Sequence, residues 1–231
     1  MKRQAGRIVM SADEVVKRLR KSGSQKTIDG MARYGIPSTR AFGVPMGAML
    51  KLAKEVGKDH ALAKALWTTG WYEARMMSSL VGEPEKVTAA EMTAWAADFD
   101  SWAICDTVCF KLWDQSPLAW KMAPKWAASK AEFVKRTGFV LMACLSHHDK
   151  HAADKDFLAF LPLIEKGASD DRNFVKKGVS WALRGIGGRS AALNKAAVIL
   201  AKRLAASPED AACWIGKDVL KQLSARASRG Q

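Results

Sequence analysis

The sequence predicts an all-α protein whose helices stack as antiparallel pairs into a solenoid. Three observations lead to this fold class. Helix-start signals recur along the whole chain of 231 residues. No stretch alternates apolar and polar residues between turn dipeptides, as a strand would. Helix pairs also recur after roughly 40 residues, the repeat length of HEAT-like and armadillo arrays. We therefore expect a C-shaped, HEAT-like α/α superhelix that forms a single domain over residues 1–231. The sequence does not repeat exactly, so an irregular α bundle is the alternative that periodicity leaves open.

Capping residues, prolines and glycines set the expected helix boundaries. Ser11, Thr88 and Ser129 each stand three residues before a glutamate, which is the pattern of a capping box. Ser116 and Ser207 each precede a proline that suits a first helical turn. Glycine and proline mark the breaks between helices. We predict helices over 11–22, 45–57, 59–68, 72–81, 88–98, 101–114, 117–127, 129–147, 154–167, 171–186, 191–205 and 208–226.

The composition is that of a globular protein with a substantial core. Hydrophobic residues make up 48% of the chain and charged residues 26%, which argues against disorder. No segment has the apolar run that a membrane span needs, and the basic N-terminus lacks the apolar centre of a secretory signal. We therefore expect a cytoplasmic protein with reduced, buried thiols and neither a disulfide framework nor a zinc site. The cysteines are Cys105, Cys109, Cys144 and Cys213.

Positive charge is concentrated at the two ends of the chain. The formal net charge is +14, of which residues 1–45 and residues 170–231 contribute +7 each, whereas residues 46–169 are neutral. A curved solenoid with basic ends suits an extended polyanion, so we expect a nucleic acid as partner. A basic surface that only keeps the protein soluble is the alternative.

The densest group of chemically active residues lies on the helix predicted over 101–114. Trp102, Asp106, Cys109 and Trp113 recur at helical spacing and should share one face. A carboxylate within an apolar and aromatic face is costly unless it is paired or used. Asp106 either stabilises a cation beside the π-face of Trp102, or is a core carboxylate paired with an arginine of a neighbouring helix. The residues alone favour the pairing.

Two further groups are basic. Lys177, Trp181 and Arg184 share one face of the helix predicted over 171–186. Cations beside an indole suit a nucleic-acid surface, although a solvated basic face with a partly buried tryptophan is also common. Arg136 stands among apolar residues and needs an anion, which is either Asp106 or a phosphate of DNA.

The histidines give a weaker signal. His147 and His151 are four residues apart and beside His148, so a metal pair is conceivable, but no HExxH pattern accompanies them. The chain also has no glycine-rich phosphate loop and no GxSxG motif. We therefore expect neither a metal ion nor a cofactor.

Several stretches, in this order, resemble the DNA alkylation repair (AlkD-like) family. They are LWTTGWYEAR at 66–75, DFDSW at 98–102, EFVKR at 132–136 and RNFVKKGVSWALR at 172–184. The resemblance spans roughly residues 28–226. It implies a HEAT-like fold and a monofunctional DNA glycosylase, a hydrolase of N-glycosidic bonds that removes N3- or N7-alkylated purines in base excision repair.

The resemblance also implies the site residues. The catalytic set would be Trp102, Asp106, Arg136 and Trp181, and the damaged nucleotide need not be flipped into a pocket. We expect a monomer that binds double-stranded DNA containing alkylated bases. The DNA-binding residues would be Lys135, Arg172, Lys176, Lys177, Arg184 and Arg189.

The expected reaction needs few catalytic groups. An N3- or N7-alkylated purine is already cationic and leaves readily, so positive charge moves onto the deoxyribose in the transition state. Asp106 would stabilise that charge and orient water, while the indoles of Trp102 and Trp181 contact the cationic sugar. The alternatives are a non-catalytic HEAT-repeat binder of damaged or branched DNA and a protein-interaction scaffold.

Overall fold

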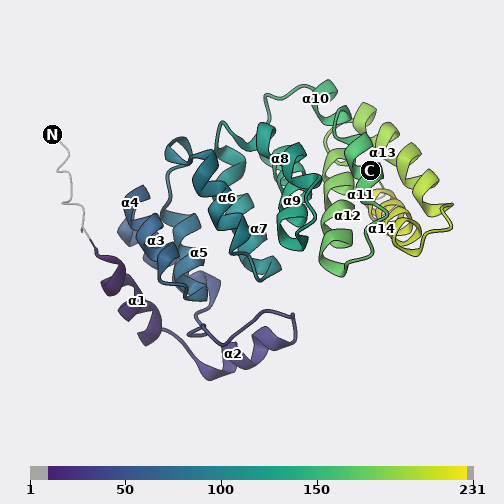
Figure 1. The fold of residues 1–231 in the computed structure, drawn as a ribbon. Coiled ribbons are helices and arrows are strands. Elements are labelled where there is room, and N and C mark those ends of the chain that lie inside the picture. Colours follow the sequence, from purple (N-terminus) through teal and green to yellow (C-terminus); the bar gives the residue numbers. More distant parts are fainter. Residues whose placement is uncertain (1–9, 228–231) are drawn as a thin grey trace. The chain divides into compact units, whose positions relative to one another are not determined.

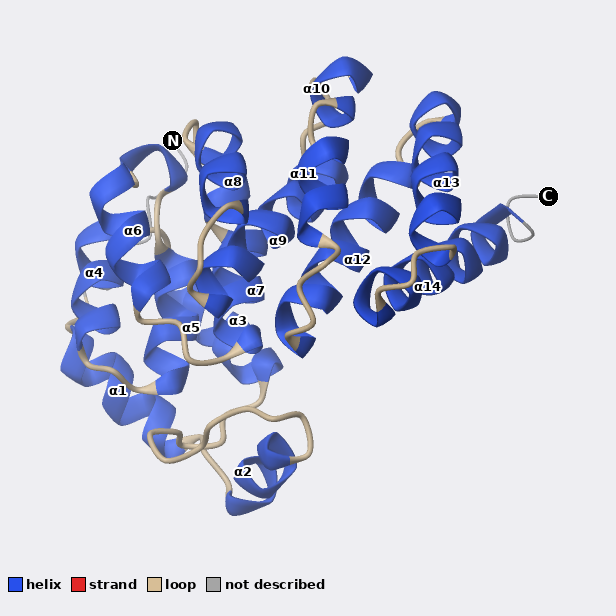
Figure 2. Cartoon of the chain, turned by 45° about the vertical axis from the view of Figure 1, so that its right-hand side comes forward, coloured by secondary structure: helices blue, strands red, loops and turns tan. Residues whose placement is uncertain are grey.

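The computed structural model describes residues 10–227, and all regular secondary structure in that part of the chain is helical. That part holds fourteen α-helices and two 3₁₀ turns. Figure 2 shows helices joined by loops, with no strand among the described residues. The predicted all-α class is confirmed. No helix among these residues is long and apolar enough to cross a membrane. The chain packs as two compact units, Met1–Leu112 and Trp113–Gln231. The single domain and the C-shape stay predictions.

The first unit stacks short helices in chain order. Figure 1 shows α3, α4 and α5 packed next to one another, with α5 also against α7. One helix here was not predicted: α2 lacks a capping box and has Gly30 in its interior, although Ser24 caps its start. The elements are α1 (Ala12–Lys21), α2 (Gln25–Ala32), α3 (Met46–Val56), α4 (His60–Thr68), α5 (Tyr72–Val81), η1 (Pro84–Lys86), α6 (Ala89–Ala97) and α7 (Trp102–Lys111).

The second unit is built around two helix pairs. α9 packs along α12, and α13 packs along α14. The helix predicted over 154–167 is two short helices, because Pro162 starts a new helical turn after Phe160. The elements are η2 (Trp113–Gln115), α8 (Ala119–Ala127), α9 (Glu132–His148), α10 (Asp154–Leu158), α11 (Leu161–Gly167), α12 (Asn173–Gly187), α13 (Ala191–Ala205) and α14 (Asp210–Ala227).

Glycines let neighbouring helices of this unit come into contact. A Cβ atom at Gly138 of α9 would lie 2.3 Å from the backbone nitrogen of Ala127, at the end of α8. At Gly216 of α14 it would lie 2.2 Å from the backbone nitrogen of Ala205, at the end of α13. Both gaps are too small for any side chain, so glycine at these positions sets the spacing of the pairs α8–α9 and α13–α14.

The capping residues were read correctly at some helices and wrongly at others. Ser11 and Glu14 form the predicted capping box of α1. Ser129 accepts from the backbone N–H of Ala131 at 3.2 Å, and α9 begins only at Glu132. Ser116 likewise accepts from a backbone N–H two residues later, and α8 begins only at residue 119. Ser207 accepts from the backbone N–H of Glu209 at 3.2 Å, and α14 begins only at Asp210. All three serines stabilise a turn before the helix and do not cap it, so these three predictions were wrong.

The predicted stripe on α7 is shorter than expected. The helix ends at Lys111, because the backbone of Leu112 leaves the helical region with φ −136° and ψ −56°. Trp113 therefore lies in the 3₁₀ turn η2, where its side chain is completely buried. The prediction that Trp113 shares the face of Trp102 and Asp106 was wrong.

A buried carboxylate fixes the long loop before α3. Glu73 of α5 is completely buried. Its oxygens accept from three successive backbone N–H groups, those of Phe42, Gly43 and Val44, at 2.7 to 3.1 Å. Hydrogen bonds to a charged acceptor are the strong kind. They hold the loop over residues 33–45 against α5.

The Glu73→Gln variant is therefore expected to lose stability. The amide keeps one acceptor but turns an NH₂ group toward N–H donors, so at least one buried donor is left unsatisfied. The free energy of unfolding should fall by about 2–3 kcal/mol. Urea denaturation measures this, with Glu85→Gln in the exposed turn η1 as the matched control. Equal midpoints for the two variants would show that the contact adds no stability.

Candidate nucleic-acid interface

Trp102 and Asp106 lie one turn apart on α7 of the first unit. Both side chains are half-buried. Ser101 caps the helix by accepting from the backbone N–H of Ala103 at 3.2 Å. The indole Nε1 of Trp102 donates to the carbonyl of Tyr34 at 2.8 Å, which fixes the ring. A carboxylate therefore stands one helical turn from a positioned indole, as the spacing predicts.

Arg136 and Trp181 belong to the second unit. Arg136 of α9 is buried, and its Nη1 donates to the carbonyl of Phe174 in α12 at 2.5 Å. Trp181 is half-buried on α12. The predicted catalytic set is thus divided, with Trp102 and Asp106 in one unit and Arg136 and Trp181 in the other. That the four side chains form one cluster stays a prediction.

Two of the predicted DNA-binding cations meet the same carboxylate. The Nζ of Lys135 lies 2.7 Å from Oδ2 of Asp170. Arg172 donates to Asp170 from Nε at 2.9 Å and from Nη2 at 2.6 Å, and its Nη1 donates to the carbonyl of Lys130. These cations hold the pKa of the Asp170 carboxyl well below its usual range, the bonds from Arg172 having the largest effect. Lys135 and Arg172 thus join the start of α9 to the loop before α12.

The Asp170→Asn variant is expected to lose stability in a pH-dependent way. Removing the charge leaves two cations without their counter-ion, which should cost about 2–3 kcal/mol of unfolding free energy at pH 7. Because the folded-state pKa is depressed, the wild-type advantage is present above the unfolded pKa. It should shrink as the pH falls from about 5 toward 2. Urea melts at several pH values measure it, with the exposed neighbour in Asp171→Asn as control. A pH-independent difference would contradict the ion-pair account.

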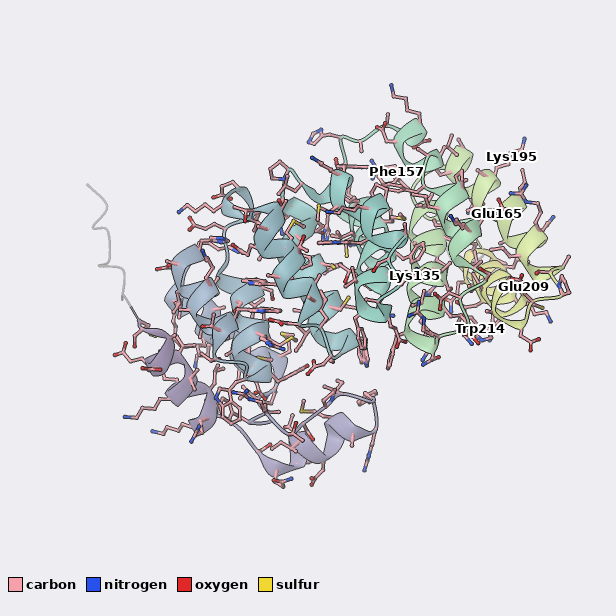
Figure 3. All side chains as sticks on the ribbon, in the orientation of Figure 1. Lys135, Phe157, Glu165, Lys195, Glu209 and Trp214 are labelled. Atoms are coloured by element: carbon pink, nitrogen blue, oxygen red, sulfur yellow. The ribbon has the colours of Figure 1, made fainter. Side chains whose placement is uncertain are left out.

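Arg189, another predicted DNA-binding residue, is used inside the second unit. Its Nη1 donates to the carbonyl of Ser146 and its Nη2 to that of Ala152, at 3.2 and 2.7 Å. The guanidinium also lies 4.3 Å from the ring centre of Phe157. The contact with Ser146 is at the end of α9, whereas Lys135 is in its first turn. Figure 3 labels Lys135 and Phe157, the residue whose ring the Arg189 guanidinium meets. Arg189 therefore ties the loop after α9 to the end of α12.

The remaining predicted cations lie where α12 meets α14. The Nζ of Lys176 is 5.0 Å from the ring centre of Trp214. Asp218 of α14 accepts from the hydroxyl of Ser180 at 2.5 Å and lies 3.5 Å from Nε of Arg184. Lys177 is exposed beside them. We call this surface the α12–α14 face, made of Lys176, Lys177, Trp181, Arg184, Trp214, Lys217 and Lys221.

Sequence reasoning missed the α14 half of this face. Trp214 is 39% exposed, which is unusual for an indole, and Figure 3 shows it on α14. Lys217 and Lys221 follow it at helical spacing and are exposed. That spacing, a tryptophan with lysines three and seven residues later, was the available signal. Cations around an exposed indole suit phosphate and sugar contacts.

The contact of His148 and the burial of the cysteines are typical of residues with a structural role. His148 Nδ1 contacts the buried carboxylate of Asp114, and burial raises the pKa of that carboxyl. No group of three or more metal-ligating side chains occurs among the described residues. Three of the four thiols are buried, and Cys213 is half-buried.

Comparison with known proteins connects this geometry to one family. The profile described as "DNA alkylation repair enzyme" matches residues 15–211. One similar solved structure is described as "A new family of proteins related to the HEAT-like repeat DNA glycosylases with affinity for branched DNA structures". It has a TM-score of 0.76 and 21% sequence identity, covering 92% of this chain and 95% of that chain. At that identity it establishes the HEAT-like fold alone. No curated protein matches the chain.

Proposed function

This chain belongs to the DNA alkylation repair enzyme family, and we propose that it binds duplex DNA and excises cationic N3- or N7-alkylated purines. The observation that carries the proposal is the pair on α7. Asp106 stands one turn from Trp102, both side chains are half-buried, and the indole is fixed by its bond to Tyr34. A positioned carboxylate and a π-face suit the stabilisation of a cation.

The proposed reaction is hydrolysis of the N-glycosidic bond. The alkylated base leaves as a neutral purine and takes both bonding electrons, so the deoxyribose becomes cationic. Asp106 stabilises this charge and orients the water that adds to the sugar carbon. The indole of Trp102 contacts the cationic sugar, and the predicted roles of Trp181 and Arg136, which belong to the other unit, stay predictions.

The proposed DNA contacts are on the α12–α14 face. Lys176, Lys177 and Arg184 would neutralise phosphates, and Trp214 would contact a sugar. Lys135, Arg172 and Arg189 keep positive charge near the ends of α9 but already have partners in the second unit. We therefore propose that these three residues position the helices. We also propose that the protein acts as a monomer.

A salt titration tests the binding half of the proposal. The affinity of wild-type protein for a short duplex should fall steeply as salt rises, because bound lysines and arginines release condensed counter-ions. Sequence preference should be slight, since phosphate contacts carry no base information. Salt-independent affinity would contradict the proposed contacts.

A second candidate is non-catalytic binding of branched DNA. It is favoured by the similar structure described as having affinity for branched DNA. Matched linear and four-way-junction DNA of equal length distinguish the two. A repair glycosylase should bind both with comparable affinity and release base from the alkylated duplex. A branched-DNA binder should prefer the junction strongly and release none.

A further inference from the structure

The first unit contains a pocket that the proposed reaction does not use. Its volume is about 210 Å³, and it lies between the loop over residues 33–45, the start of α5 and the start of α7. Arg40, Tyr72, Arg75 and Asp100 give it its polar lining, and Ile104 is part of its apolar wall. Ile104 is about 200° around α7 from both Trp102 and Asp106. The pocket is therefore on another face of the helix than the candidate catalytic pair.

Each of the two guanidinium groups is held by a backbone carbonyl. Arg40 Nη2 donates to the carbonyl of Thr69 at 2.8 Å, and Arg75 Nη1 donates to that of Asp98 at 3.2 Å. Nη2 of Arg75 also lies 3.6 Å from the carboxylate of Asp98. Arg75 also lies 5.1 Å from the ring centre of Trp67. A guanidinium has five N–H donors, so these bonds orient the groups and leave donors over. One such donor, Nε of Arg75, is buried without a hydrogen-bond partner.

The backbone and a phenol complete the lining. Gly70 has φ +69°, and a Cβ there would lie 3.0 Å from Nη1 of Arg40, so glycine lets the guanidinium sit against the turn. Burial raises the pKa of Tyr72 to about 12, helped by the negative charges of Glu73 and Asp100. The Tyr72 hydroxyl therefore keeps its proton at neutral pH and can donate it in a hydrogen bond.

An aromatic stack adjoins the pocket. The rings of Phe42 and Trp71 are stacked with centres 4.4 Å apart, and both are half-buried. Arg20 and Arg40 each lie 5.5 Å from the ring centre of Trp71. Arg40 thus belongs both to the pocket and to this stack, which offers an aromatic and cationic surface for a sugar or base.

We propose that this pocket binds one phosphodiester group of a DNA strand through Arg40, Arg75 and the hydroxyl of Tyr72. The adjacent nucleoside would contact the stack of Phe42 and Trp71. The inference rests on the proposed function for its ligand, DNA, but concerns a separate site.

The negative charge of Asp100 selects between sources of phosphate. Two arginines and one aspartate line the pocket, and the carboxylate of Asp98 lies 3.6 Å from Nη2 of Arg75, so the surplus positive charge at the site is small. A phosphodiester carries a single negative charge, whereas free phosphate near neutral pH is a mixture of singly and doubly charged ions. Asp100 can also accept a hydrogen bond from a base amino group. The pocket should therefore prefer a phosphate within a strand to the free ion.

The test compares Arg40→Gln, Tyr72→Phe and the control Arg33→Gln in the full chain. Arg33 is exposed, ends α2 and does not line the pocket. Arg40→Gln should weaken duplex binding roughly tenfold. It should also reduce the slope of log affinity against log salt by about 1. Tyr72→Phe should weaken binding at an unchanged slope, because it removes a neutral donor. Arg33→Gln should leave both quantities near wild type.

Several outcomes would overturn the proposal. If both Arg40→Gln and Tyr72→Phe behave like Arg33→Gln, the pocket does not bind a phosphate of the strand. If Arg40→Gln does not fold, the result for Tyr72→Phe decides alone. Inorganic phosphate is tested against sodium chloride at equal ionic strength. A phosphate-dependent rise in melting temperature that Arg40→Gln abolishes, with unchanged DNA binding, would assign the pocket to the free ion instead.

The Lys176→Gln/Lys177→Gln variant separates this proposal from the proposed function. If that pair lowers the salt slope and Arg40→Gln does not, only the pocket assignment fails. If neither variant changes duplex binding, the proposed DNA-binding function fails as well.

Discussion

The Asp106→Asn variant is expected to release N7-methylguanine from duplex DNA roughly ten- to a thousandfold more slowly than wild type, the scale of losing one electrostatic stabiliser. The amide keeps the shape of the side chain and some of its hydrogen bonding but removes the charge. If that charge acts mainly in the transition state, DNA affinity should stay constant or rise, because a negative charge near phosphates is lost.

The same variant distinguishes a catalytic from a structural Asp106. If the Asp106 carboxylate were needed for packing, replacing it would destabilise the fold. The melting temperature and the DNA affinity of Asp106→Asn would then fall together. Excision rate, affinity and melting temperature are therefore measured on one preparation. Asp29→Asn is the control, because Asp29 is an exposed aspartate of the first unit that accepts from Gln25 in its own helix. Unchanged excision by a folded, DNA-binding Asp106→Asn protein would remove Asp106 from the mechanism.

The Lys176→Gln/Lys177→Gln variant should show the largest change in binding. Each neutralised phosphate contributes about 0.9 to the salt slope, so losing two lysines should reduce the slope by roughly 1.8. Affinity should fall for every duplex sequence alike, because no base contact is removed. Fluorescence anisotropy over a range of salt concentrations measures both quantities.

The control for this variant removes equal charge elsewhere in the second unit. Lys155 of α10 and Lys195 of α13 are exposed, and the bond from Ser190 to Asp154 joins the starts of these two helices. Figure 3 shows Lys195 at a distance from Trp214. Lys155→Gln/Lys195→Gln should leave the slope near wild type. Equal losses in both double variants would indicate a diffuse charge effect and no particular face.

The sequence predicts most clearly those features that depend on residues close together in the chain. The capping box at Ser11 and the one-turn spacing of Trp102 and Asp106 are local patterns, and the structure has both. The misplaced starts at Ser116 and Ser129 have a local cause too, since serine stabilises a turn as readily as it caps a helix.

Contacts between distant segments were not predictable in this way. Glu73 accepts from N–H groups about thirty residues before it, and Lys176 meets an indole on another helix. Helical spacing indicates which residues share a face but not what that face contacts. For the same reason, the pairing of Lys135 with Asp170 could not be read from the sequence, and the DNA contact of Lys135 stays a prediction. The sequence shows that a residue is positively charged, but it does not show which group that residue pairs with.

The most direct test of the account is base release by the wild-type protein. Duplex DNA containing N7-methylguanine is incubated with excess protein, and free base is separated from DNA and measured over time. We expect the wild-type protein to release base well above spontaneous depurination, Asp106→Asn to release it roughly ten- to a thousandfold more slowly, and Asp29→Asn to release it at the wild-type rate. No release above the spontaneous rate, from a duplex that the protein demonstrably binds, would contradict a glycosylase and leave the binding function alone.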